Sequence, residues 1–170
     1  MQKLIFSAAL LLSLGLAGCG DDSETAKEKN EAKETEQSQV GSKDVEDWGD
    51  KIKKIAGNNE VTPDKYLELE RYAMNYNPTT EEVDQFKKDI IAEYKSNHYL
   101  DDITDDEYML TNIFKSYLVI NNSKAGSPIV EFATDFFQNM SSTYRGEKPV
   151  DSDLVKTNEE EMNKIIPEIE

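Results

Sequence analysis

The stretch SPIVEFATDFFQNM, residues 127–140, decides the fold because its apolar side chains recur at helical spacing. It opens with Ser127 and Pro128, a capping residue followed by the residue favoured at the first helical position. The apolar residues that follow at i, i+3, i+4, i+7, i+8 and i+11 are Ile129, Phe132, Ala133, Phe136, Phe137 and Met140. This spacing puts them on one face of an α-helix and predicts that the face is buried.

Four stretches before residue 127 repeat the helical period with almost no alternation of period two, so the sequence predicts an all-α fold. They cover roughly residues 44–56, 62–77, 79–97 and 104–120. In the last of them apolar residues lie on nearly every side, which is typical of a central helix. Short connections favour antiparallel neighbours, so we expect a compact bundle of about five helices over residues 44–146.

Local signals place the ends of these helices. Thr62 precedes Pro63, a cap followed by a proline, and Thr104 with Glu107 three residues later has the pattern of a capping box. Gly146 is expected to end the last helix of the domain, because glycine commonly follows a helix C-terminus.

Residues 147–170 have no comparably clear pattern and are predicted to form a looser acidic tail. A short helix is expected to follow Thr157 within this tail, with Pro167 ending it.

The first twenty residues, MQKLIFSAALLLSLGLAGCG, differ in kind from the rest. Lys3 precedes an apolar run over residues 4–16, which has the length of a signal peptide and is too short to span a bilayer as a helix. Two small residues then precede Cys19, the only cysteine in the chain. This stretch resembles the lipobox of bacterial lipoproteins, and with the lysine-rich composition it resembles small lipoproteins of low-GC Gram-positive bacteria. An ordinary secretory signal with an incidental cysteine is the alternative.

The lipobox resemblance implies that residues 1–18 are removed as a signal peptide and that a diacylglyceryl group is attached to Cys19. A buried methylene contributes about 0.8 kcal/mol, so two acyl chains would hold the protein at the membrane permanently. The implied location is the extracytoplasmic face of the cell membrane. Residues 20–43 are polar and charged apart from Val40, so residues 19–43 are predicted to be a lipidated cysteine followed by a flexible, disordered tether.

The chain carries 35 acidic and 19 basic side chains, a formal net charge of −16. Nucleic-acid binding and adsorption onto anionic lipid both need clustered lysine and arginine, so this balance argues against both. Its plainest role is to keep the protein soluble. His98 is the only histidine and no serine lies in a G-x-S-x-G motif, so we expect neither enzyme activity nor a cofactor.

Two groups of residues are candidate binding sites. The carboxylates of Asp101, Asp102, Asp105 and Asp106 are weak metal candidates, because calcium prefers oxygen ligands. Their spacing does not match an EF-hand loop, and the first turn of a helix explains the last two of them equally well. Tyrosine is enriched at protein interfaces, so the candidate interaction residues are Tyr66, Tyr72, Tyr76 and Tyr99. The alternative is that the tyrosines line the rim of the core.

These observations favour a non-catalytic, lipid-anchored helical module that contacts another protein at the cell envelope, in assembly, signalling or exclusion. The alternative is a module that binds a small molecule or a cation through the tyrosines and the acidic cluster, and an envelope hydrolase is a third hypothesis. A concave pocket lined by tyrosines would favour ligand binding. A grooved or flat apolar surface would favour a protein partner.

Overall fold

The computed structural model describes residues 47–170, in which all regular structure is helical. The all-α prediction is therefore confirmed. Residues 1–46 lie outside the described residues. They include the predicted signal peptide, Cys19, the predicted tether and residues 44–46 of the first predicted helix. None of the described helices is long and apolar enough to cross a membrane. The helices are α1 (Trp48–Ala56), α2 (Thr62–Asn75), α3 (Thr80–Lys95), α4 (Asp106–Asn122), α5 (Pro128–Tyr144) and α6 (Asp153–Ile169).

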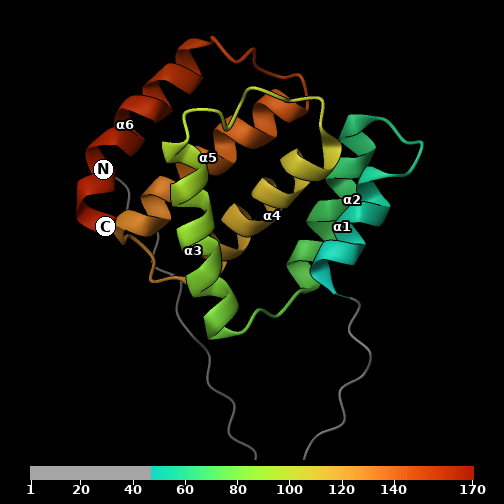
Figure 1. Ribbon diagram of the computed structural model, residues 1–170, viewed down its shortest axis with the longest axis horizontal. Helices are drawn as coiled ribbons and strands as arrows, with labels where there is room; N and C mark the ends of the chain where they lie inside the picture. The colour runs from blue at the N-terminus through green and yellow to red at the C-terminus, as the bar shows by residue number, and fades with distance from the viewer. Residues whose placement is uncertain (1–46) are drawn as a thin grey trace, which may run out of the picture. The chain divides into compact units, whose positions relative to one another are not determined.

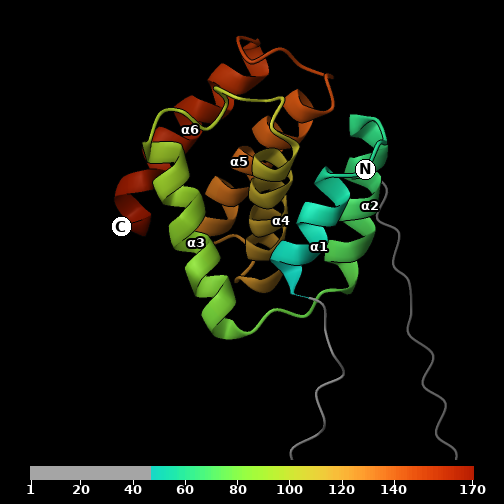
Figure 2. The same ribbon diagram turned by 45° about the vertical axis from the view of Figure 1, so that its right-hand side comes forward.

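Helix α4 lies at the centre of the bundle (Figure 1). It packs against α1, α2, α3 and α5, and the view turned by 45° shows the same arrangement (Figure 2). Helix α6 packs along the outer side of α5. The prediction that the fourth helix is central is confirmed, because it carries buried residues around most of its circumference: Met109, Leu110, Asn112, Ile113, Phe114, Ser116, Leu118 and Val119.

The ring of Phe114 joins three other helices to α4. Its centroid lies 5.6 Å from that of Trp48 on α1 and 6.2 Å from that of Phe86 on α3. Two tyrosine rings of the α2 region, Tyr72 and Tyr76, lie 5.6 Å and 5.3 Å from it. Aromatic pairs in such geometries contribute about 0.5–1.5 kcal/mol each beyond the area they bury. This one side chain therefore organises the half of the core that contains α1 and α2.

The start of α4 differs from the prediction. Asp105, not Thr104, caps the helix, and its carboxylate accepts a hydrogen bond from the N–H of Tyr108 at 3.0 Å. The Thr104 hydroxyl instead donates to Asp102 at 2.8 Å in the preceding turn. The predicted capping box between Thr104 and Glu107 is therefore wrong, because a closer acceptor for the threonine lies before the helix.

Two other helix starts combine expected and unexpected features. Thr79 and Glu82 form a capping box at the start of α3, where a helix was expected at Thr79 or Thr80. At α2 the capping residue is Val61, so Thr62 lies in the first turn of the helix and does not cap it.

Residues 147–170 also differ from the prediction of a loose tail. Ser152 caps α6, which packs against α5 and carries the buried side chains Val155 and Met162. Between them Asn158 donates a hydrogen bond to Asn139 of α5 at 2.8 Å. The sequence predicted only a short helix after Thr157 and missed the first turn of α6 and its packing, because the interior residue Asn158 is polar and a distant side chain satisfies it. Pro167 does not end the helix and lies in its last turns.

We predict that Phe136→Ala lowers the free energy of unfolding by about 3–5 kcal/mol, the usual cost for a buried aromatic residue. Phe136 is fully buried, and its ring stacks on Tyr99 at 5.4 Å. Urea denaturation measures the change. The matched control is Phe137→Ala on the same helix, which removes a half-buried ring and should cost clearly less. A loss below about 1 kcal/mol for Phe136→Ala would contradict the packing described here.

Candidate functional site

Most of the tyrosines hold helices together through their hydroxyl groups. Tyr76 donates to Glu82 at 2.7 Å, Tyr108 to Glu93 at 2.6 Å, and Tyr144 to Asp106 at 2.7 Å. In all three, burial first and then the carboxylate partner raise the pKa of the tyrosine, so the hydroxyl remains a donor at neutral pH. These tyrosines line the rim of the core, as the alternative interpretation of the sequence proposed.

Tyr99 belongs to a buried polar network between α5 and α6. Its hydroxyl donates to Glu159 at 2.9 Å and accepts from Asn139 at 2.9 Å, and Asn139 in turn accepts from Asn158. Only 4% of Tyr99 is exposed. The prediction that Tyr99 contacts a partner is therefore wrong, because the core takes both its ring and its hydroxyl. Tyr72 and Tyr76 pack their rings on Phe114, which also directs them inward.

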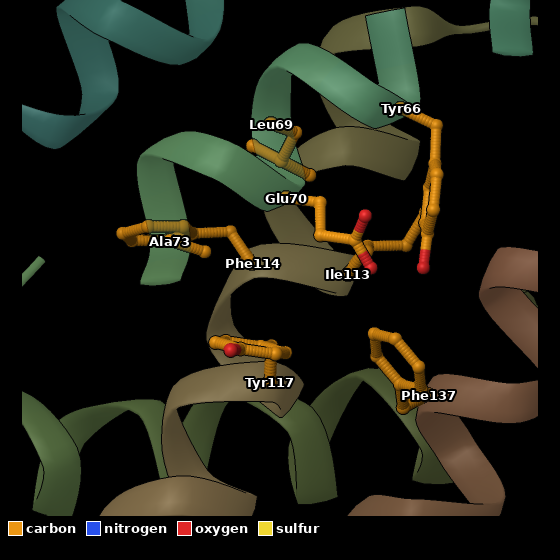
Figure 3. A pocket seen from close by; sticks show the side chains of 8 residues that line it. All are labelled: Tyr66, Leu69, Glu70, Ala73, Ile113, Phe114, Tyr117 and Phe137. Carbon is orange, nitrogen blue, oxygen red and sulfur yellow. The ribbon is translucent and has the colours of Figure 1, made fainter. Parts of the chain in front are cut away.

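A small hollow remains where α2, α4 and α5 meet (Figure 3). We call it the aromatic hollow; its lining residues are Tyr66, Leu69, Glu70, Ala73, Ile113, Phe114, Tyr117 and Phe137. Figure 3 shows the rings of Tyr66, Tyr117 and Phe137 around the space, with the carboxylate of Glu70 reaching towards it. The free volume is about 10 Å³, which is room for about one water-sized group.

Charged groups gather around the Tyr66 hydroxyl. Burial is the largest cause that raises the pKa of Tyr66; Arg145 lowers this pKa, while Glu70 and Glu147 raise it. The Arg145 guanidinium lies 4.5 Å from the centroid of the Tyr66 ring and donates to Glu147 at 2.9 Å. Glu70 is exposed and has no ion pair within residues 47–170. Four aromatic side chains and the unpaired Glu70 are thus among the residues that line the hollow.

Sequence reasoning singled out only Tyr66 among these groups. Phe137 was placed in the apolar stripe of residues 127–140, and neither Tyr117 nor Glu70 was singled out. The helical period shows which residues share a face of a helix. It does not show which of them will line a gap, because that depends on how two other helices pack across α4.

A broader and more open groove lies between α3, the start of α5 and the end of α6. Two adjoining hollows of about 460 and 490 Å³ share Lys88, Ile91 and Ile169. We call this the isoleucine groove, since Ile91, Ile129 and Ile169 line it. Its charged rim is largely paired within the protein: Lys87 contacts Asp84, and Lys95 contacts Glu170.

The acidic cluster is not gathered into one site. Asp101 contacts the exposed side chain of His98, Asp102 accepts from Thr104, and Asp105 caps α4. Within residues 47–170 no group of three or more acidic, histidine or cysteine side chains is arranged to hold a metal ion.

Asp106 has a structural role in this region. Its carboxylate contacts Lys65 of α2 at 2.5 Å and accepts from Tyr144 of α5. Burial alone would raise the pKa of Asp106, but the hydrogen bonds from Lys65 and Tyr144 outweigh it and lower the pKa. Lys65 also donates to the carbonyl of Ala56, so this cluster ties α1, α2, α4 and α5 together.

No protein family matches this chain, and no curated protein or solved structure is similar enough to count as a match. Only the chain's own residues therefore indicate its function.

One carboxylate has an unfavourable environment in the folded state. Asp135 is half-buried on α5, and burial, followed by the charges of Glu161 and Glu131, raises its pKa to about 6. Its ordinary pKa is 3.8, so the fold favours the protonated acid. Protonated Asp135 therefore makes its full contribution to the stability of the folded state below its ordinary pKa of 3.8. This contribution is lost as the pH rises through about 6.

We predict that Asp135→Asn stabilises the protein by about 1–2 kcal/mol near pH 7.5 and changes its stability little near pH 4. The amide keeps the shape of the protonated acid without a charge that repels its neighbours. Chemical denaturation at the two pH values measures the difference. Asp151→Asn, in an exposed loop, is the control and should change little at either pH. Equal effects of Asp135→Asn at both pH values would contradict the assignment.

Proposed function

We propose that the protein is an extracytoplasmic lipoprotein, anchored through Cys19, whose helical domain binds another protein at the cell envelope without catalysis. The lipobox resemblance supports the anchor, and residues 19–43 would act as the spacer between membrane and domain. Residues that can do acid–base chemistry have structural partners here: His98 contacts Asp101 on the surface, and several tyrosine hydroxyls connect helices.

The observation that carries the binding proposal is the surface of α2 beside the aromatic hollow. Leu67 and Met74 are 43% and 68% exposed, which is unusual for large apolar side chains in this domain. They are three and four residues from Glu70, so the three side chains are neighbours on the helix surface. Glu70 also lines the aromatic hollow. Exposed apolar side chains next to an unpaired carboxylate and a ring-lined depression are features of a protein contact surface.

The size of the hollow supports a protein partner over a small molecule. A concave space lined by tyrosines was expected to favour ligand binding, and this one is lined by Tyr66 and Tyr117. Its free volume of about 10 Å³ is, however, far below the roughly 300–1,000 Å³ of a small-molecule pocket. The hollow fits the tip of one side chain, which favours a protein partner.

The charge of the chain indicates the kind of partner. A formal net charge of −16 speeds association with a basic protein and opposes association with an acidic one. We therefore propose that the partner presents a basic surface to α2. An anchor on the same membrane would raise the local concentration of the two proteins, so that a modest affinity suffices.

The isoleucine groove supports a second candidate, a module that binds a small apolar molecule. Its two hollows of about 460 and 490 Å³ lie within the usual range for ligand sites. If this candidate were correct, an apolar ligand would shift the NMR signals of the Ile91 and Ile169 methyl groups and leave those around Tyr117 unchanged.

To test the principal proposal, a photo-crosslinking amino acid is placed at Met74 in intact cells. The control position is Glu160, which is exposed on α6. We expect one adduct from position 74, formed with a basic envelope protein, and none from position 160. Mass spectrometry identifies the adduct and the state of the mature N-terminus.

The anchor is tested in the same cells with Cys19→Ser. This substitution should remove the protein from the membrane fraction and abolish the adduct. An unmodified Cys19 in the membrane fraction would refute the anchor, and equal adducts from positions 74 and 160 would refute the binding surface.

A further inference from the structure

The isoleucine groove follows one side of α3, and the start of α5 and the end of α6 lie beside it (Figure 1). The α3 residues that line it are spaced at i, i+3, i+4, i+7, i+8 and i+11: Asp84, Lys87, Lys88, Ile91, Ala92 and Lys95. They form one stripe on the helix, and at a rise of about 1.5 Å per residue the stripe is about 16 Å long. The groove is therefore an elongated site and suits an elongated ligand.

Three isoleucine side chains leave apolar surface uncovered in this groove. Ile91, Ile129 and Ile169 are half-buried, and each packs against the core as well as lining the groove. They come from α3, α5 and α6, so each of the three helices contributes apolar surface. A hydrocarbon chain in the groove would remove this surface from water, which favours binding in proportion to the area covered.

One cation of the groove has no partner in the protein. Lys87 contacts Asp84 and Lys95 contacts Glu170, so these charges are balanced in pairs. Lys88 is exposed and makes no ion pair within residues 47–170. It lines both hollows of the groove, so the charged end of a ligand in either hollow lies beside the lysine side chain.

Glu168 is the opposing charge that the ligand meets. This carboxylate is also exposed and outside the ion pairs of the described residues, but it lines only the hollow beside α5. Because Lys88 lines both hollows and Glu168 only one, the groove as a whole favours a negative head group. One lysine balances the single charge of a carboxylate, whereas a phosphate monoester carries about two charges.

The length of the groove indicates the size of the chain. An extended chain advances about 1.2 Å per bond, so a chain of about 14 carbon atoms spans a groove of about 16 Å. The two hollows, of about 460 and 490 Å³, are in the range that holds small ligands.

We propose that the isoleucine groove binds a long-chain fatty acid, whose carboxylate pairs with Lys88 and whose chain lies along Ile91, Ile129 and Ile169. This inference goes beyond the contact proposed for α2. It rests on the second candidate function, for which it names the class of ligand.

Photo-crosslinking on the full-length protein in lipid nanodiscs tests the proposal, with a diazirine-bearing analogue of myristate as the probe. We expect adducts within residues 84–95 and 168–170, and excess myristate should suppress them. Lys88→Gln should weaken this competition by myristate about two- to fivefold, the usual range for an exposed ion pair, and leave competition by uncharged tetradecanol unchanged. Lys156→Gln, which removes an exposed lysine near the start of α6, is the matched control and should change neither.

The sign of the preferred charge is tested with Glu168→Gln. Removing this carboxylate should strengthen competition by myristate and weaken competition by tetradecylamine, which carries a positive head group. The opposite pair of changes would assign the groove to a cationic amphiphile and overturn the inference.

Two further results would overturn it. If myristate competes equally with Lys88→Gln and Lys156→Gln while adducts still form in the groove, the fatty-acid inference fails and the second candidate function stands. If no adduct forms in the groove, or excess myristate does not suppress the adducts, both fail. The adduct at position 74 is measured separately, so neither result bears on the contact proposed for α2.

Discussion

The fold depends on the burial of α4 on most of its sides, and Phe114 is the side chain where this constraint is most evident. A helix that is apolar nearly all round needs neighbours in every direction, and α1, α2, α3 and α5 supply them. Phe114 packs against Trp48, Tyr72, Tyr76 and Phe86 from three of these neighbours. The aromatic hollow follows from the same constraint, because α2 and α5 both cover α4 and a small gap lined by Tyr117 remains between them.

Polar interactions at the edge of this core determine how the helices are placed. Asp106 receives Lys65 and Tyr144 and so fixes the start of α4 against α2 and α5. At the other side of α5, Asn139 joins Tyr99 to Asn158 and positions α6. Buried polar groups of this kind are costly unless satisfied, so each network specifies one arrangement of its helices. The abundance of tyrosine has the same explanation, since its ring fills the core while its hydroxyl reaches a carboxylate at the rim.

The helical faces could be predicted from the sequence because they depend on local spacing. The stripe from Ile129 to Met140 and the central position of α4 both followed from this spacing. Features that depend on a distant partner could not be predicted. Helix α6 was predicted only as a short helix in a loose tail, because Asn158 interrupts its stripe and is satisfied by Asn139, nineteen residues earlier in the chain. The hollow was missed for the same reason, since Glu70, Tyr117 and Phe137 are brought together only by tertiary packing.

The central claim is that the surface of α2 around Glu70 contacts a basic envelope protein, and zero-length crosslinking in intact cells tests it most directly. A water-soluble carbodiimide activates a carboxylate, which then forms an amide with an amine in contact with it, with net loss of one water molecule. The account predicts a crosslinked peptide that joins the side chain of Glu70 to a lysine of a basic envelope protein. Coupling of that protein to other exposed carboxylates, such as Glu81, but never to Glu70 would contradict the account.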